Sequence, residues 1–177
     1  MARTNPVIRP AMPRHVAAIT DIYAHHVLHG FASFETEPPN AAEMRRRYRL
    51  VREQGLPFLI AELDGRIAGY AYASAYRARA AYRYTVEDSV YVQHGQQGRG
   101  VGSALLTALI AGCTQAGRRQ MIAVIGDSAN RPSIRLHERC GFIHVGLLPA
   151  TGWKFSRWID SVLMQRGLGP GASSPPA

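Results

Sequence analysis

Residues 87–109, EDSVYVQHGQQGRGVGSALLTAL, join three patterns in one short stretch. EDSVYV (87–92) predicts a strand, and the apolar positions between Val101 and Leu109 follow helical spacing. Between them lies the glycine-rich segment 95–102. A turn of this kind presents backbone N–H groups at the positive end of a helix, where an anion binds well. The stretch therefore predicts a strand–turn–helix unit that holds a phosphate.

Two common phosphate-binding motifs do not fit this turn. A nucleotide-triphosphate loop requires Gly-Lys-Ser/Thr, which is missing at the needed spacing. A dinucleotide fingerprint requires a third glycine after Gly98 and Gly100, and Ser103 occupies that place. The pattern that fits is Gln/Arg-x-x-Gly-x-Gly/Ala, with Gln97, Gly100 and Gly102. A plain strand-to-helix turn is the alternative interpretation.

The rest of the chain predicts a single domain over residues 1–168, with no internal repeat. Strands are expected at 7–11, 58–63, 66–73, 87–92, 121–125, 142–148 and 158–164, helices begin near residues 13, 41, 101 and 132, and residues 76–84 form a loop. The order β-α-α-β-β-β-α-β-α-β-β predicts a mixed α/β fold. Residues 169–177, GPGASSPPA, are too rich in Gly, Pro and Ser to pack and predict a disordered tail.

Composition limits the partners of the chain. Its net charge is +9, almost all from arginine, and Lys154 is its only lysine. The arginines form no run of five, which favours a solvated basic surface over a nucleic-acid partner. No apolar run approaches the roughly 20 residues that cross a bilayer, and the N-terminus lacks a secretory signal. Cys113 and Cys140 suggest no disulfide framework, so we expect a cytoplasmic protein without a membrane partner.

Two motifs together resemble the GNAT superfamily of acetyltransferases. The first is the turn 97–103, and the second is NRPSIRLHERCGF (130–142), in which His137 stands where many members carry Tyr. His137, FETEP (34–38), RAR (77–79), YTVEDSVYV (84–92) and GWKFSRWID (152–160) are similar to the phosphinothricin acetyltransferase branch, which includes relatives acting on methionine sulfone and sulfoximine. The resemblance covers residues 6–168.

The resemblance implies a mixed, mostly antiparallel twisted sheet, flanked by helices and split into a V between its fourth and fifth strands (87–92 and 121–125). Acetyl-CoA would lie in the V of each subunit of a homodimer. The residues implied to bind it are Val90, Tyr91 and Val92 along the pantetheine arm, Gln97, Gly98, Arg99, Gly100, Val101, Gly102 and Ser103 at the pyrophosphate, and Asn130 and Ser133 near the thioester.

Acetyl transfer to an amine needs a base, because a free α-amine is largely protonated near neutral pH. Glu87 is our candidate, since burial in the V would raise its pKa toward the working range. His137 is the second catalytic candidate, either as a donor to the CoA sulfur or in relaying the amine proton. A solvated Glu87 and a structural His137 are the alternatives. The N–H near Val92 is expected to stabilise the oxyanion.

An amino-acid substrate also carries a carboxylate and, in this branch, a phosphinyl or sulfonyl group. Arg77 and Arg79 are predicted to bind such groups through paired hydrogen bonds. Tyr82 and Phe34 are predicted as pocket walls, and a neighbouring subunit is an alternative source of Phe34. A carboxylate near the site, Glu35 or Glu37, would bind the substrate ammonium. Simple loop charges are the alternative for the two arginines.

Three further features have competing interpretations. His25, His26 and His29 have a spacing that can bind zinc, but a polar helix end near the pocket is the preferred interpretation, so we expect no metal. Lys154 could meet an anionic group of substrate or cofactor. The aromatic residues Trp153, Phe155 and Trp158 fit an interface, a pocket wall or the core.

The favoured function is transfer of acetyl from acetyl-CoA to the α-amine of L-phosphinothricin or L-methionine sulfone or sulfoximine. The first alternative is acetylation of a protein or peptide amine, which the Arg77/Arg79 pair disfavours for cationic peptides. The second is a non-catalytic nucleic-acid-binding module, which leaves the glycine turn unexplained.

Overall fold

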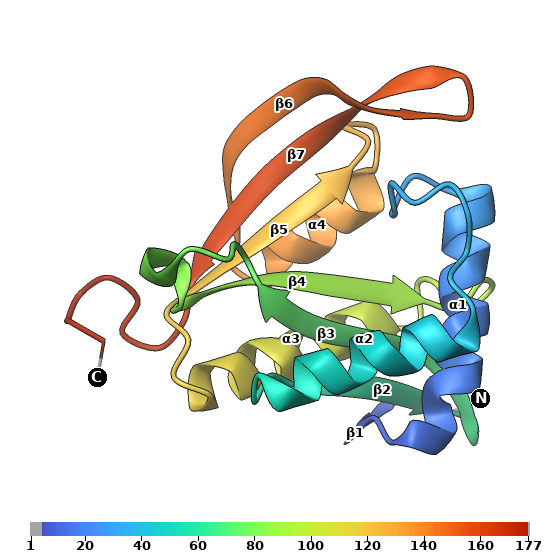
Figure 1. Ribbon diagram of the computed structural model, residues 1–177, viewed down its shortest axis with the longest axis horizontal. Helices are drawn as coiled ribbons and strands as arrows, with labels where there is room; N and C mark the ends of the chain where they lie inside the picture. The colour runs from blue at the N-terminus through green and yellow to red at the C-terminus, as the bar shows by residue number, and fades with distance from the viewer. Residues whose placement is uncertain (1–4, 177) are drawn as a thin grey trace.

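The predicted order of strands and helices is the order found in the computed structural model, which describes residues 5–176 (Figure 1). The elements are β1 (Val7–Pro10), α1 (Val16–His29), α2 (Ala41–Glu53), β2 (Phe58–Leu63), β3 (Arg66–Ala75), β4 (Thr85–Val92), α3 (Val101–Gln115), β5 (Gln120–Gly126), α4 (Arg131–Arg139), β6 (Ile143–Lys154) and β7 (Arg157–Gly167), with short 3-10 helices η1 (Pro13–His15) and η2 (Ala80–Tyr82).

Local sequence chemistry accounts for several of these boundaries. Asp64 and Gly65 both have positive φ, as the two central residues of a tight hairpin turn between β2 and β3 require. Asn40 and Asn130 cap α2 and α4 by accepting hydrogen bonds from the third residue beyond each. Gly141, with φ of 82°, lets the chain leave α4.

The sheet has the order β1-β2-β3-β4-β5-β7-β6 and is antiparallel except between β4 and β5. These two parallel strands pair only from Thr85–Gln120 to Glu87–Ile122. Beyond Glu87 they diverge, and β5 continues with the β6–β7 hairpin away from β4 (Figure 1). The predicted V between the fourth and fifth strands is therefore confirmed.

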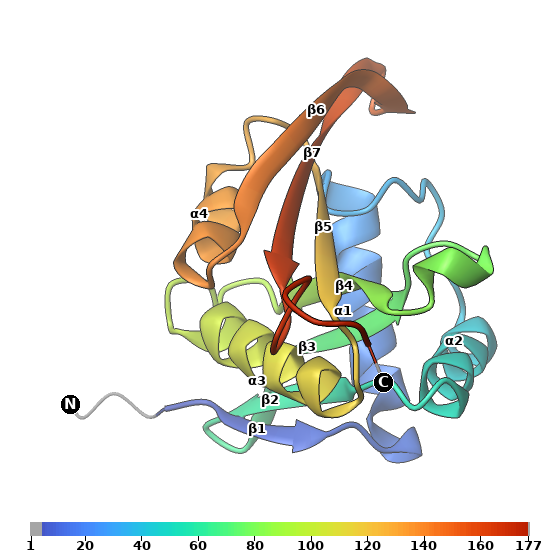
Figure 2. The ribbon, with the colours of Figure 1, turned by 90° about the vertical axis from the view of Figure 1, so that its left-hand side faces the viewer.

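Helices cover both faces of the sheet. α3 and α4 lie on one face, and α1 and α2 lie on the other (Figure 2). Leu105, Leu109 and Cys113 of α3 are fully buried, as is Val27 of α1, while Tyr23 of α1 packs against Tyr91 of β4. Because strand residues alternate between faces, even-numbered side chains of β4 face α3 and odd-numbered ones face α1.

In two segments the structure contains more regular secondary structure than the sequence predicts. The β6–β7 hairpin runs to Lys154 and restarts at Arg157, so both strands are longer than predicted. Phe155 and Ser156, with φ of 50° and 58°, form its turn without any glycine or asparagine signal. In the loop 76–84, the structure adds the single turn η2.

The C-terminal segment contains turns only, and the Arg119 guanidinium donates to Ser174 and to the Pro175 carbonyl. The single-domain boundary at residue 168 and the disordered tail stay predictions. Between residues 5 and 176, no helix has the length and apolarity to cross a bilayer.

Candidate active site

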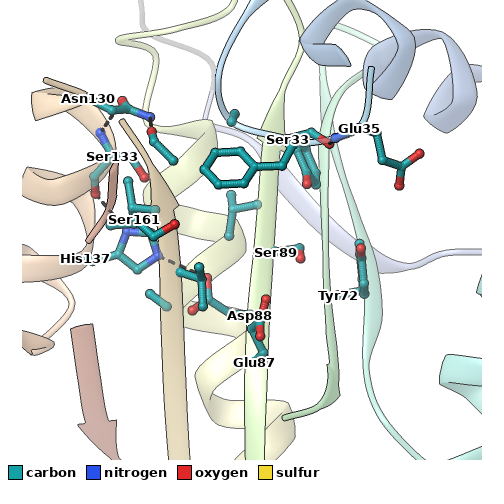
Figure 3. A pocket seen from close by; sticks show the side chains of 18 residues that line it. Ser33, Glu35, Tyr72, Glu87, Asp88, Ser89, Asn130, Ser133, His137 and Ser161 are labelled. Carbon is teal, nitrogen blue, oxygen red and sulfur yellow. Dashed lines mark hydrogen bonds and ion pairs between the residues drawn. The ribbon is translucent and has the colours of Figure 1, made fainter. Parts of the chain in front are cut away.

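A cavity of about 430 Å³ occupies the gap between the diverging strands (Figure 3). Loop 32–35, β3, β4, β5, α4 and β7 contribute its walls. Because the gap lies beyond the edge of β4, side chains from both faces of that strand reach it. Glu87 and Asp88, neighbours in the chain, both line the cavity although strand geometry sends them to opposite faces.

Beyond Glu87, the backbone groups along the edge of β4 that faces the gap do not pair with β5. In an antiparallel ladder, every second residue hydrogen-bonds to the neighbouring strand and the residues between point their backbone groups away from it. Tyr76 N donates to Thr85 O and Gln93 N donates to Ala68 O, so the odd-numbered residues of β4 are the ones that bond to β3. By this alternation Val90 and Val92 direct their backbone groups into the gap. Tyr91 instead pairs with Tyr70 of β3, so the predicted backbone contact from Tyr91 to a pantetheine arm is not available.

The glycine turn leads from β4 into α3 without a side-chain cap. Gly98 and Gly100 have φ of 74° and 82°, and a Cβ at either would meet no atom within 4 Å. The first helical hydrogen bond is Ala104 N to Gly100 O, so the N–H groups of residues 101–103 have no acceptor within the helix. These three N–H groups lie at the positive end of α3, an arrangement that favours an anion.

The remaining side chains of the turn are directed elsewhere. Arg99 is exposed and donates to Gln96 and to Asp64 in the β2–β3 turn. Gln97 is exposed and Val101 is buried in the core. Gly102 lies against α4, where a Cβ would come within 3.2 Å of Leu136. The turn therefore offers an anion its backbone N–H groups, while the side chains of Arg99 and Val101 hold the turn in place.

Glu87 is half-buried where β4 and β5 begin to separate. Burial, and then the nearby Asp88 carboxylate, raise the pKa of Glu87 above its ordinary value. A carboxylate of raised pKa is a stronger base when it is ionised. Glu87 therefore lies on the cavity wall with its pKa shifted in the direction expected for a base, and its catalytic role stays a prediction.

His137 is buried on α4 and has hydrogen-bond partners at both ring nitrogens. Nε2 lies 3.0 Å from Asp88 Oδ2, and Nδ1 lies 2.8 Å from Ser133 O. Burial lowers the pKa of His137, but the hydrogen bond and charge of Asp88, with the Ser133 carbonyl, outweigh it and leave the pKa raised. Asp88 was not predicted from the sequence.

The opposite wall is formed by loop 32–35. The Glu35 carboxylate accepts hydrogen bonds from Arg47 (2.6 Å) and from the Tyr23 hydroxyl (2.9 Å), so its charge is compensated. The Phe34 ring lies against two glycines, since a Cβ at Gly126 or Gly152 would come within 2.9 Å or 2.6 Å of it. Phe34 thus lines the cavity of its own chain.

Comparison with known proteins places this site in a family. A profile of the acetyltransferase (GNAT) family matches residues 11–142. The chain belongs to the GNAT family of acetyltransferases. It is 51% identical over 176 residues to phosphinothricin N-acetyltransferase of Alcaligenes faecalis, covering 99% of this chain and 89% of the relative.

Two other relatives support the same branch. An L-methionine sulfoximine/L-methionine sulfone acetyltransferase of Salmonella typhimurium is 40% identical over 161 residues, covering 91% of this chain and 94% of the relative. The crystal structure of a phosphinothricin acetyltransferase from Sinorhizobium meliloti in complex with AcCoA has a TM-score of 0.95 and 45% identity, covering 98% and 94% of the two chains. The predicted family, branch and fold are confirmed.

Some predicted residues of this GNAT chain lie outside the cavity wall. Arg77 and Arg79 are exposed in the β3–β4 connection, and the Arg77 guanidinium lies over the rings of Tyr76 and Tyr82. Neither arginine nor Tyr82 lines the cavity. Their predicted contact with substrate stays a prediction.

Lys154 is buried at the end of β6, where its ammonium donates to the carbonyls of Gly30 (2.9 Å) and Ser33 (2.7 Å). The alternative contact with an anionic group of substrate or cofactor stays a prediction. The buried ammonium fixes the loop that carries Phe34 and Glu35.

The histidine cluster gathers beside the end of β4. The His25 ring lies 4.8 Å from that of His29 and 4.6 Å from that of His94, and His26 Nε2 donates to Val92 O. Within residues 5–176, no group of three ligand side chains is arranged to hold a metal ion. None of these histidines lines the cavity.

Asn130 and Ser133 line the cavity at the start of α4, as the resemblance implied. Asn130 Oδ1 also accepts from Ser133 N (3.3 Å), so it caps the helix. The aromatic residues Trp153, Phe155 and Trp158 are between 53% and 62% exposed, so the core interpretation of them is wrong. They do not line the cavity either.

Five polar residues of the wall were not predicted from the sequence: Ser33, Tyr72, Asp88, Ser89 and Ser161. A signal existed for Asp88, because a carboxylate in the middle of a strand on the helix-covered face must have a partner. Ser161 and Tyr72 lie on other strands, and nothing local marks them.

Proposed function

We propose that this GNAT protein transfers the acetyl group of acetyl-CoA to the α-amine of a small amino acid such as L-phosphinothricin, L-methionine sulfone or L-methionine sulfoximine. The observation that carries the proposal is a cavity in the gap of the sheet with Glu87 on its wall, bordered by β4, which leads through the glycine turn into the uncapped N-terminus of α3. The identity to enzymes named for these substrates supports it.

The backbone of the gap fits a CoA molecule. The N–H groups of residues 101–103 suit its pyrophosphate, and the open space at Gly98 and Gly100 leaves room for the phosphate oxygens. The edge of β4 offers hydrogen bonds to the amides of the pantetheine arm at Val90 and at the Val92 N–H, while Val92 O already accepts from His26. When bound, acetyl-CoA supplies the activated acetyl group, and the Val92 N–H is placed to stabilise negative charge on the acetyl oxygen.

The acceptor side suits an amine. The cavity wall carries the carboxylates of Glu35, Glu87 and Asp88 and no lysine or arginine. Glu35 and Asp88 have cationic partners, so Glu87 is free to receive the proton of the bound ammonium. Removing that proton exposes the lone pair that attacks the thioester.

The carboxylate of the amino acid needs a cation, and the cavity wall does not supply one. Arg77 and Arg79 lie in the connection between β3 and β4, the strands that carry Tyr72 and Glu87. We propose that these two arginines bind the carboxylate or the phosphinyl or sulfonyl group at the mouth of the cavity, with Tyr82 beside them.

The test is release of CoA thiol from acetyl-CoA with a panel of amino acids. We expect turnover with L-phosphinothricin and the L-methionine sulfone and sulfoximine, little with their D-enantiomers, and little with a peptide N-terminus. Arg77→Ala and Arg79→Ala should raise the acceptor KM. Silence across the panel contradicts the substrate, and turnover of peptides alone favours the protein-acetylating alternative.

We also propose that the protein is cytoplasmic and that it forms a homodimer. The supporting observation is the exposed apolar surface of the β6–β7 hairpin, where Ile143, Leu147, Trp153 and Trp158 are each more than half exposed. Sedimentation equilibrium should give twice the chain mass, and Trp153→Glu should lower it toward one chain. A monomer at micromolar concentration contradicts the proposal.

A further inference from the structure

A buried carboxylate–imidazole pair lies on the α3/α4 face of the cavity. The side chains of Asp88 and His137 are only 2% and 5% exposed, and the Nε2–Oδ2 distance is 3.0 Å. Asp88 Oδ1 has no hydrogen-bond partner. The pair joins β4 to α4 across the gap in the sheet (Figure 3).

The contacts define the protonation state of the ring. The Ser133 carbonyl can only accept a hydrogen bond, so His137 Nδ1 carries a hydrogen. An ionised Asp88 also only accepts, so Nε2 carries the second hydrogen and the ring is an imidazolium. The alternative, a protonated Asp88 and a neutral ring, gives up the charge-assisted bond that offsets burial of both groups.

The surroundings of the pair favour the same state. The ionisable groups that interact electrostatically with Asp88 are Glu87, from the other face of β4, and Cys113 of α3, and neither is a cation. Ala123 of β5 and Ser161 of β7, the cavity residues on the far strands, are neutral. A cation at His137 thus meets carboxylates and no competing positive charge.

The pair and the predicted base lie on opposite faces of β4. Asp88 faces α3 and α4, on the side of the glycine turn, whereas Glu87 faces α1 and α2. The thioester end of a bound CoA would pass between them. With CoA held at the turn before α3, His137 would lie on the side of the departing thiolate, and Glu87 would lie on the side of the incoming amine.

We propose that Asp88 is a positioning residue of this acetyltransferase, which holds His137 as a doubly hydrogen-bonded imidazolium so that His137 serves as a fixed cation and not as a base. The inference rests on the proposed function. The held cation offsets the negative charge that develops on the departing thiolate. Because both ring nitrogens already carry hydrogens, the amine proton goes to Glu87 alone.

Asp88→Asn is the discriminating variant, since the amide keeps the size of the side chain and can still hydrogen-bond to Nε2. An amide N–H donating to Nε2 holds a neutral ring, so only the charge is lost. We expect kcat to fall at least about 10-fold, because a fixed charge that stabilises the transition state contributes at least this much to the rate. The alkaline limb of the kcat profile should move to lower pH, because without the carboxylate the ring loses its proton more easily.

Two controls accompany this variant. Glu62→Gln makes the same chemical change at a carboxylate that pairs with Arg9 on β1, remote from the cavity, and should leave kcat unchanged. A double variant of Asp88→Asn with His137→Gln should lose no more activity than His137→Gln alone, because Asp88 acts through the ring. A wild-type kcat and pH profile for Asp88→Asn overturns the proposal.

A second measurement does not depend on the variant folding or on the substrate. Side-chain ¹⁵N NMR of the wild-type protein at pH 7, with His137→Gln to assign the signal, reports hydrogens on each ring nitrogen. Two protonated nitrogens support the proposal, and a single one overturns it. Failure of the substrate panel would contradict the proposed function and leave this ionisation result standing.

Discussion

The two faces of β4 offer different kinds of group to a ligand. On the α3/α4 face, the continuous stretch 97–103 leads from β4 into α3 and offers backbone N–H groups, outside the lining of the cavity itself. On the α1/α2 face, the acceptor wall is assembled from loop 32–35, β3 and β4, and works through side chains. The loop is fixed from a distant element by Lys154.

The difference predicts how each face responds to substitution. A backbone site depends on φ and on open space, so side-chain truncation within it should matter little. A side-chain site depends on individual groups and on the contacts that fix them. Variants of the acceptor face should change turnover or the acceptor KM, and variants of the turn should change the affinity for acetyl-CoA.

The largest effect is expected at the acceptor face from Glu87→Gln. The amide cannot take the amine proton, so kcat should fall about 10²- to 10⁴-fold while acetyl-CoA affinity stays unchanged. In wild type, kcat should fall with decreasing pH as Glu87 protonates, over a range set by its raised pKa. Thiol release and calorimetry measure the two quantities, and the exposed Glu53→Gln is the control. A normal rate would exclude Glu87 as the base.

On the turn, Gly100→Val should weaken acetyl-CoA binding about 10- to 100-fold, because a β-branched residue at φ of 82° costs roughly 1–3 kcal/mol or displaces the N–H groups. Gly95→Val is the matched control. It imposes the same strain at φ of 81°, outside the 97–103 motif. Both should lose similar thermal stability, and equal loss of acetyl-CoA affinity in the two variants would contradict the backbone site.

Lys154→Met tests whether the acceptor wall depends on a remote contact. Removing two charge-assisted hydrogen bonds releases loop 32–35, and the acceptor KM should rise about 10-fold with acetyl-CoA affinity unchanged. Arg66→Met, which removes an exposed cation, is the control. Since Lys154 is the only lysine, its single ¹⁵Nζ signal reports the contact directly. Equal losses for both substrates would mean a general loss of structure.

The smallest effect is expected from Arg99→Ala within the turn. Its ion pair with Asp64 is exposed, and such pairs contribute at most about 1 kcal/mol. Acetyl-CoA affinity should change less than about 3-fold by calorimetry. A large loss would show that the arginine side chain itself binds the phosphates, and the contrast between the two faces would no longer hold.

Much of the fold was predictable because its signals are local. Helical spacing, the Asp-Gly turn after Leu63 and the Asn caps each act within a few residues, so element order and type agree with the structure. The ends of β6 and β7 were not predictable. Their turn at Phe155 and Ser156 carries no usual signal, and its conformation follows from strand pairing.

The residues of the site also fall into those that the sequence predicted and those that it did not. Glu87, Asn130, Ser133 and Phe34 reach the cavity as predicted, whereas the backbone of Tyr91 pairs with β3. The partners of Asp88 and Lys154 were not predicted, because they are distant in the sequence. Asp88 pairs with His137, and Lys154 donates to Gly30 and Ser33.

By itself, the sequence determined the glycine turn, the family it belongs to and the strand that precedes it, because those depend on backbone freedom and short-range periodicity. Only the tertiary structure decided that β4 and β5 separate after Glu87, that Asp88 meets His137 across that gap, and that the single lysine holds the acceptor loop. Burying a charge requires a partner in space, and a partner in space can come from any part of the chain.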